Sequence, residues 1–288
     1  MTARPVLPDA VQGALWMLCS GTCYVAASTL MRHLGGAYST YELTFLRSLI
    51  AVAMLTPMLM RAGRISLWPE QPLLHFLTGV FSYLGILFWF LAASQMPVGD
   101  FFALQFVTPL ITIAMAIVFL RERADAASWA ATLIGLAGVL IVLRPGLVAV
   151  TAGALAALAS SLAYASVNTL VKSLSRTVSA TGIVFYANLW LVPISMPMGL
   201  VAWRTPLLAD LPAIFGVAVL STLGYMTVTK AIGLAPARVV QPVNFIRMPI
   251  AAAFGLVVFG EFPDVWTWVG AFVIFLATSW AVRRGARQ

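Results

Sequence analysis

Apolar stretches of about 20 residues recur along the whole chain, and this feature limits the possible folds more than any other. A helix that crosses the roughly 30 Å hydrocarbon core of a bilayer needs about 20 apolar residues. Only 9% of the 288 residues are charged, whereas an ordinary soluble domain has roughly 25%. Because a bilayer offers no water to backbone polar groups, apolar stretches of this length are expected to be helical. The sequence therefore predicts an all-α integral membrane protein.

We predict ten transmembrane helices joined by short loops, with no room for a soluble domain. They span residues 11–34, 41–61, 73–93, 98–120, 127–143, 150–171, 181–201, 212–232, 237–259 and 265–282. The first of them is too long for the apolar region of a signal peptide, so we expect no cleavable signal.

Lysine and arginine residues are divided unevenly between the two sides that these ten helices define. One side holds twelve of them, and the other side holds only Arg32, Arg144 and Arg204. Cytoplasmic loops of membrane proteins are enriched in both residue types, so we expect both termini in the cytoplasm. The same topogenic cations account for the net charge of +8. We therefore expect the protein to lie in a lipid bilayer, and we do not expect its positive charges to bind nucleic acid.

The two halves of the chain resemble each other in sequence. Residues 13–30 align with residues 153–170 at a constant offset of 140, and Gly85 then pairs with Gly224 at an offset of 139. A repeat that covers most of the chain is the signature of an internally duplicated fold.

Each half holds five of the predicted helices, the first in residues 1–146 and the second in residues 147–288. Because five is odd, the second repeat enters the membrane from the opposite side. Inverted repeats are common in secondary transporters, where they expose one central site alternately to each side of the membrane. The alternatives are a channel and a duplicated scaffold without transport activity.

Several motifs, in this order, resemble the drug/metabolite transporter superfamily and its ten-helix EamA-like family. They are YELTFLRSLIAVAML at 41–55, VTPLITIAMAIVFLRERADAASWAATLIGLAGVLIVLRPG at 107–146 and QPVNFIRMPIAAAFGLVVFGEFPDVWTWVGAFVIF at 241–275. The resemblance implies a bacterial inner-membrane carrier of small metabolites, in many members an exporter of amino acids. A similar group contains uptake carriers for S-adenosylmethionine, which also show an arginine in the ninth segment. Amino-acid export is therefore the first expectation, and S-adenosylmethionine uptake is the alternative.

Arg247 is the residue that we expect to bind an anionic group of the substrate. It lies about eleven residues, or roughly 16 Å, beyond Pro236 at the start of the ninth segment. A charged group near the bilayer midplane generally faces the bundle interior or a wet cavity. Gln241, Asn244 and Arg247 recur at every third residue and so form a polar stripe. No acidic residue at similar depth neutralises Arg247, which favours a binding role over helix–helix packing.

Polar and aromatic side chains of other segments are expected to complete the wall of a substrate cavity. In the fourth segment such residues fall within about 60° of one another on a helical wheel. The predicted substrate-binding residues are Phe101, Gln105, Thr108, Tyr24, Tyr83, Tyr164, Asn168 and Tyr225. For each of them, packing between helices is the alternative.

Arg47 and two prolines each have more than one expected role. Arg47 either pairs with Glu42 or reaches lipid headgroups, or it gives the cavity a second positive group. Pro109 and Pro249 lie in the middle of segments four and nine, where a proline frees one carbonyl and kinks the helix. Because both halves have such a proline, we favour hinges over static kinks.

The sequence argues against catalysis and against ATP-driven transport. His33 and His75 fall at opposite faces of the membrane, so neither can activate a nucleophile in its core. Cys19 and Cys23 alone satisfy neither a disulfide framework nor a metal site, and no GxxxxGK[ST] motif is present. We expect no enzyme activity, no metal, no cofactor and no ATP. A small amino-acid-like metabolite is the expected ligand.

Overall fold

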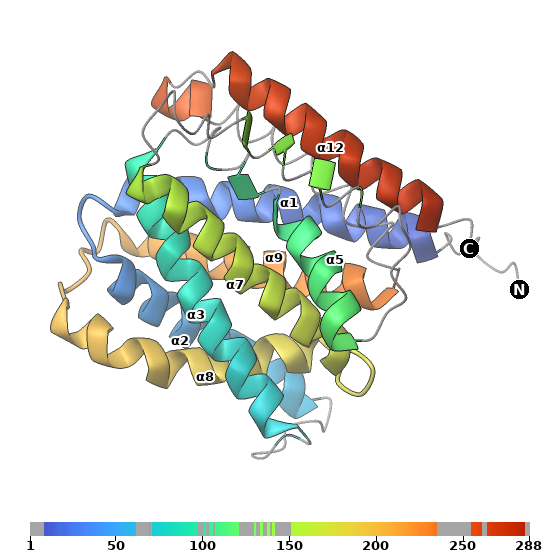
Figure 1. Ribbon diagram of the computed structural model, residues 1–288. Coiled ribbons are helices and arrows are strands. Elements are labelled where there is room, and N and C mark those ends of the chain that lie inside the picture. The colour runs from blue at the N-terminus through green and yellow to red at the C-terminus, as the bar shows by residue number, and fades with distance from the viewer. Residues whose placement is uncertain are drawn as a thin grey trace, which may run out of the picture.

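The computed structural model describes residues 9–61, 69, 71–96, 101, 104–105, 107–120, 130, 133–134, 137–138, 140–141, 151–234, 255–260 and 264–285. Within this part of the chain every regular element is a helix (Figure 1). The longer helices are α1 (Asp9–Leu34), α2 (Thr40–Arg61), α3 (Pro72–Gln95), α7 (Ala152–Leu174), α8 (Ala180–Val201), α9 (Leu211–Leu234) and α12 (Val265–Gly285). The shorter ones are α5 (Val107–Leu120) and the π-helical turn η2 (Gly255–Phe259).

Among the described residues, six helices are long and apolar enough to cross a membrane, namely α1, α2, α3, α7, α8 and α9. Their bounds agree with the predicted segments to within three residues. The predicted all-helical membrane protein is thus confirmed. Predicted segments 127–143 and 237–259 lie mostly outside the described residues, so the count of ten helices stays a prediction.

Two helices begin with the same serine cap. Ser39 Oγ accepts a hydrogen bond from the backbone N–H of Glu42 over 3.1 Å at the start of α2. Ser179 Oγ accepts one from the N–H of Gly182 over 3.3 Å at the start of α8. Such caps satisfy an N–H that has no partner within the helix. Because Ser39 and Ser179 are 140 residues apart, the repeat in sequence appears here as a repeat in local structure.

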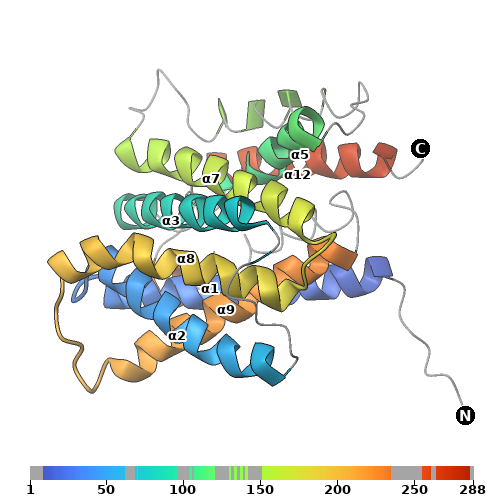
Figure 2. The same ribbon diagram turned by 90° about the horizontal axis from the view of Figure 1, so that it is seen from below.

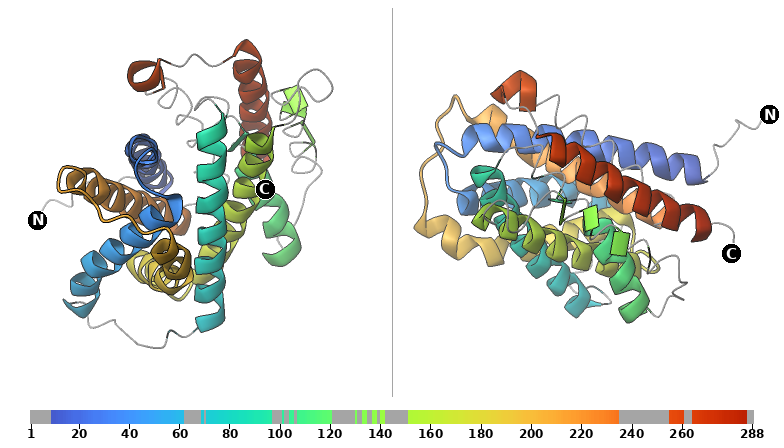
Figure 3. Two further views of the ribbon diagram at one scale, coloured as in Figure 1. Left: turned by 90° about the vertical axis from the view of Figure 1, so that its left-hand side faces the viewer. Right: turned by 45° about the horizontal axis from the view of Figure 1, so that its top comes forward.

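The helices lie in two layers (Figure 2). One layer holds α1, α2, α8 and α9, and the other holds α3, α5, α7 and α12. The closest pairs join the two halves of the chain, since α1 packs on α9, α2 on α8, and α3 on α7. In Figure 3 the start of α1 and the end of α12 lie at the same end of the bundle.

Two equivalent hydrogen bonds link the halves. Ser20 Oγ in α1 donates to the carbonyl oxygen of Gly224 in α9 over 3.0 Å. Ser160 Oγ in α7 donates to the carbonyl oxygen of Gly85 in α3, also over 3.0 Å. Both serines are fully buried. Hydrogen bonds of this kind hold membrane helices close together. The two bonds therefore keep α1 close to α9 at Gly224, and α7 close to α3 at Gly85.

The loop between α1 and α2 is tied to the loop between α8 and α9. The Tyr38 hydroxyl donates to Asp210 Oδ2 over 2.7 Å and accepts from the backbone N–H of Leu207 over 2.9 Å. Arg204 Nη1 donates to the carbonyl oxygen of Ala37 over 3.1 Å. The hydrogen bond to Asp210 raises the pKa of Tyr38, because loss of the phenol proton would bring two negative charges together.

This loop contact predicts a pH dependence of stability. The pKa of Tyr38 is raised in the folded state, so its contribution to stability is complete below the ordinary tyrosine pKa of about 10. That contribution is lost as the pH rises through the folded-state value. We expect wild type to be more stable than Tyr38→Phe near pH 8, with the difference shrinking above pH ~10. Thermal unfolding followed by circular dichroism at both pH values checks this, and a constant difference contradicts it.

Candidate functional site

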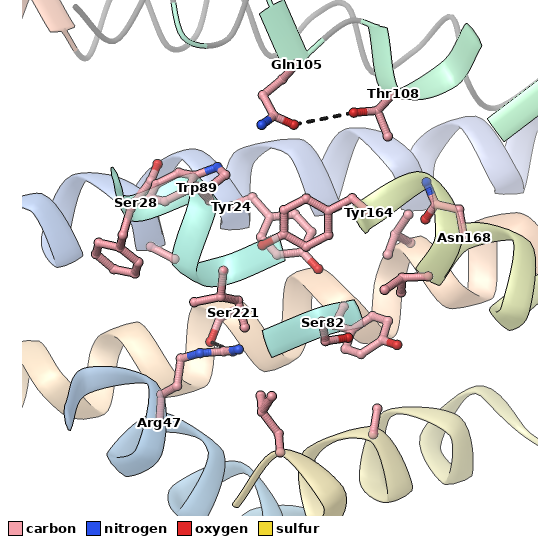
Figure 4. Close-up of a pocket in the computed structure, with 18 of the residues that line it drawn as sticks. Tyr24, Ser28, Arg47, Ser82, Trp89, Gln105, Thr108, Tyr164, Asn168 and Ser221 are labelled. Carbon is pink, nitrogen blue, oxygen red and sulfur yellow. Dashed lines mark hydrogen bonds between the residues drawn. The ribbon is translucent and has the colours of Figure 1, made fainter. Parts of the chain in front are cut away.

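A cavity of about 200 Å³ lies between α1, α2, α3, α5, α7, α8 and α9 (Figure 4). Seven of the predicted site residues line it: Tyr24, Arg47, Gln105, Thr108, Tyr164, Asn168 and Tyr225. They come from both halves of the chain, although they are far apart in sequence. The structure brings them together around one space. Their contact with a substrate stays a prediction.

Arg47 is the one charged side chain among the described residues that line the cavity. Its Nη1 donates to Ser221 Oγ over 3.3 Å. Tyr24, Tyr164 and Tyr225 line the same cavity as the guanidinium. A guanidinium carries five N–H donors, and within the described part of the chain it makes the single hydrogen bond to Ser221. The described residues thus leave N–H donors of Arg47 to which an anionic or carbonyl oxygen in the cavity could bind.

The structure also distinguishes between the two roles considered for Arg47. Glu42 is buried in the first turn of α2, and its carboxylate oxygens make no hydrogen bond to any described residue. Arg47 lies further along the same helix and contributes to the cavity wall. Arg47 therefore lies where a positive group for the cavity was one of the expected roles, and that role stays a prediction.

Gln105 and Thr108 form a polar edge on the other side of the cavity from Arg47 and Ser221 in Figure 4. Gln105 Nε2 donates to the carbonyl oxygen of Ala157 in α7 over 3.3 Å, and Thr108 Oγ1 donates to Gln105 Oε1 over 3.4 Å. These two bonds fix the orientation of the amide. A ligand in the cavity thus has polar groups at both ends and aromatic rings between them.

Several wall residues were not predicted from the sequence. They include Trp89 and Phe90 of α3, Ser28 of α1, and Asn188 and Leu191 of α8. In α3 the wall residues Ser82, Ile86 and Trp89 recur at helical spacing, which was a usable signal. In α8 the wall consists of Ala187, Leu191 and the polar Asn188, and the sequence analysis predicted no residue of this helix to line the cavity.

Phe101 and Tyr83 do not line the cavity, in contrast to their predicted role. Phe101 is 1% exposed and packs edge-on against Trp89, with ring centroids 5.0 Å apart. Tyr83 packs against a buried apolar cluster around Leu43 and Leu191. The helical wheel placed Phe101 on the same face as Gln105, but the Trp89 side chain from α3 packs over that position.

Four predicted residues lie outside the described part of the chain: Gln241, Asn244, Arg247 and Pro249. The binding role of Arg247 and the hinge role of Pro249 therefore stay predictions. Pro109 lies in α5 and lines the cavity, and the described residues 101, 104 and 105 before it are also helical. Its hinge role also stays a prediction.

Comparison with known families gives a match over most of the chain. The sequence profile described as "EamA-like transporter family" matches twice, at residues 11–144 and at residues 151–283. A solved crystal structure has the same fold, with a TM-score of 0.68 and 19% sequence identity over 97% of this chain and 98% of the other.

Curated relatives from three bacteria cover nearly the whole chain. A riboflavin transporter of Vibrio cholerae is 29% identical over 96% of this chain and 96% of its own length. An S-adenosylmethionine uptake transporter of Rickettsia bellii is 26% identical over 92% of this chain and 91% of its own. The pseudopaline exporter CntI of Pseudomonas aeruginosa is 24% identical over 92% and 94%. The three names include one uptake transporter and one exporter.

Proposed function

The chain belongs to the EamA-like transporter family, and we propose that it is a secondary transporter that moves a small metabolite across the bacterial inner membrane by alternating access. The observation that carries this proposal is the cavity between seven helices, with Arg47 and Gln105 at its polar ends. At about 200 Å³, it is smaller than the roughly 300–1,000 Å³ of pockets for drug-sized ligands. This size favours a small metabolite over a peptide or a lipid.

Alternating access is supported by the way the two halves contact each other. The Ser20–Gly224 and Ser160–Gly85 hydrogen bonds join equivalent positions with the halves exchanged. Two inverted five-helix repeats, in residues 1–146 and 147–288, account for this reciprocity. Such repeats can exchange conformations, so that one central site opens to each side in turn.

The charge of the cavity wall favours a particular class of substrate. Among the described wall residues Arg47 is cationic and none is acidic. Tyr24, Trp89 and Tyr164 supply flat aromatic surfaces on which a ring can stack. We therefore propose a neutral or anionic metabolite with a carboxylate or carbonyl group and a flat or apolar part. Amino-acid export is compatible with this class, but no observation favours it over uptake of another metabolite in the class.

Counterflow in proteoliposomes tests the transporter proposal. Purified protein is reconstituted, and vesicles are loaded with one unlabelled compound at a time. The panel contains riboflavin, S-adenosylmethionine and the common amino acids. Trans-stimulated uptake of the matching radiolabelled compound is the expected result for a carrier. Equal uptake with and without internal compound indicates a channel, and no uptake of any compound contradicts the proposal.

The proposed orientation has its own test. The excess of lysine and arginine on one side favours a cytoplasmic position for both termini. We expect a C-terminal green fluorescent protein fusion to be bright and a C-terminal alkaline phosphatase fusion to be inactive. The opposite pattern should appear for fusions in the loop between α8 and α9, near Arg204. Active phosphatase at the C-terminus contradicts this orientation.

A further inference from the structure

Two glycines outside the cavity wall set the positions of two tyrosines within it. Gly85 in α3 lies against the ring of Tyr164, and Gly224 in α9 lies against the ring of Tyr24. A Cβ atom added at Gly85 would lie 3.2 Å from Tyr164 Cε1, and one added at Gly224 would lie 3.3 Å from Tyr24 Cδ2. These separations are tighter than ordinary van der Waals contact. A methyl group at either glycine therefore requires a shift of the ring or of the backbone.

The backbone is the less mobile of the two. Ser20 lies one turn before Tyr24 and holds the carbonyl of Gly224, and Ser160 holds the carbonyl of Gly85 in the same way. Both serines are fully buried, so separating the helices would leave a hydroxyl and a carbonyl without partners in apolar surroundings. The tyrosine rings have open space beside them, because both line the cavity. An added methyl group thus pushes the ring into the cavity.

We propose that Gly85 and Gly224 are specificity-determining positions, which keep Tyr164 and Tyr24 back and so set the width of the cavity. This inference rests on the proposed function, since it takes the central cavity as the substrate site. A larger residue at either position narrows the cavity and excludes bulky flat molecules while compact ones still enter. Because the two glycines are equivalent in the repeat, each half of the chain adjusts a tyrosine of the other half.

The width of the cavity can be measured without a known substrate. The chain has two cysteines, so the variant Cys19→Ala/Cys23→Ala/Ser28→Cys carries a single thiol at a residue of the cavity wall. N-methylmaleimide is a compact probe of this thiol, and N-(1-pyrenyl)maleimide is a flat, bulky one. We measure the rate at which each probe labels the thiol and divide the rate for the pyrenyl probe by the rate for the methyl probe. When Gly85→Ala or Gly224→Ala is added to this background, we expect the ratio to fall roughly fivefold or more. This fall corresponds to about 1 kcal/mol, the lower end of the cost of overpacking by one methyl group.

Gly216→Ala is the matched control. Gly216 lies in α9, as Gly224 does, and its added Cβ would meet Leu30 Cδ1 in α1 at 3.2 Å. An alanine at Gly216 is therefore crowded about as much as one at Gly224, and both contacts lie between α1 and α9. Gly216 and Leu30 do not belong to the cavity wall, however. The rate ratio of this variant should equal that of the background. Gel filtration shows whether each variant is folded and monodisperse before labelling.

A second control removes one ring. In a Tyr164→Ala background, Gly85→Ala should no longer change the ratio, because the methyl group has no ring to push. Gly224→Ala, which acts through Tyr24, should keep its effect in the same background. If the glycines were only structural, the effect of each substitution on the rate ratio would not depend on whether the neighbouring tyrosine ring is present.

The possible outcomes separate this inference from the proposed function. An unchanged ratio in both folded glycine variants overturns the inference, and so does an effect of Gly85→Ala that persists without the Tyr164 ring. Neither result bears on counterflow, which tests transport independently. A protein that shows the narrowed cavity but exchanges no compound supports the inference about cavity width and contradicts the transporter proposal alone.

Discussion

Replacing Arg47 by alanine is expected to weaken transport of an anionic or carbonyl-containing substrate by about ten- to a hundredfold. A hydrogen bond to a charged group contributes about 1.5–3 kcal/mol, which corresponds to this range of affinity. The fold should survive the substitution, because Ser221 Oγ also donates to the carbonyl oxygen of Val217 over 2.6 Å. Concentration dependence of counterflow, with the compound that the panel identifies, measures the change in apparent affinity.

Two further variants sharpen this test. Arg47→Lys keeps the charge but loses the planar fork of donors, so its affinity should lie between those of wild type and Arg47→Ala. Arg61→Ala removes an exposed cation from the end of the same helix, outside the cavity wall, and should leave affinity unchanged. If Arg47→Ala and Arg61→Ala behave alike, Arg47 has a structural role and the anionic group is bound elsewhere.

The substitution Gly79→Ala is expected to destabilise the protein by about 1–3 kcal/mol, the usual cost of overpacking. A Cβ atom at this position in α3 would lie 2.8 Å from the Cβ of Trp190 in α8. Because Trp190 Cβ is attached directly to the backbone, no side-chain rotation relieves the contact. The two helices must therefore move apart. Thermal unfolding in detergent, followed by circular dichroism, measures the loss.

Gly233→Ala is the matched control for Gly79→Ala. Gly233 lies in α9, and an added Cβ there meets no atom of the described residues within 4 Å. Alanine in place of an unobstructed helical glycine raises stability by roughly 0.5–1 kcal/mol in ordinary helices. We expect this variant to be at least as stable as wild type. Equal unfolding temperatures for Gly79→Ala and Gly233→Ala would show that α3 and α8 can separate without cost.

The fold was more predictable from the sequence than the site was. The lengths of the six described spans follow from bilayer thickness and composition, which act on every residue of a segment. The serine caps of α2 and α8 also follow from local sequence. The positions of single side chains depend instead on how neighbouring helices tilt and rotate, and a helical wheel does not contain this information.

Individual residues show where this limit lies. Tyr24 and Tyr164 occupy equivalent positions in the sequence repeat, and both were predicted site residues. In the structure both line the cavity. Phe101 has the same periodicity as Gln105, yet Trp89 from another helix packs over it. Arg47 lies near one end of its segment, so its position along the chain was compatible with either the lipid or the cavity. Only the crossing of α2 beside α9 brings it to Ser221.

The reciprocal serine–glycine contacts have a consequence for how such a chain could arise. In a two-fold symmetric dimer every contact occurs twice, with the partners exchanged. Ser20–Gly224 and Ser160–Gly85 have this form. On the proposed inverted-repeat architecture, two separate copies of one repeat would make both contacts by pairing with each other in opposite orientations. A single chain that joins two such copies keeps both contacts.

Within one chain, the two halves can differ at equivalent positions. Arg47 and Ala187 are 140 residues apart and so occupy equivalent positions, and both line the cavity. A dimer of identical chains has to place arginine at both positions or at neither. This chain has it at one, so the described part of the cavity wall carries a positive charge at one of two equivalent positions. For the proposed class of substrate, we expect this difference to favour one orientation of a metabolite with a single anionic end.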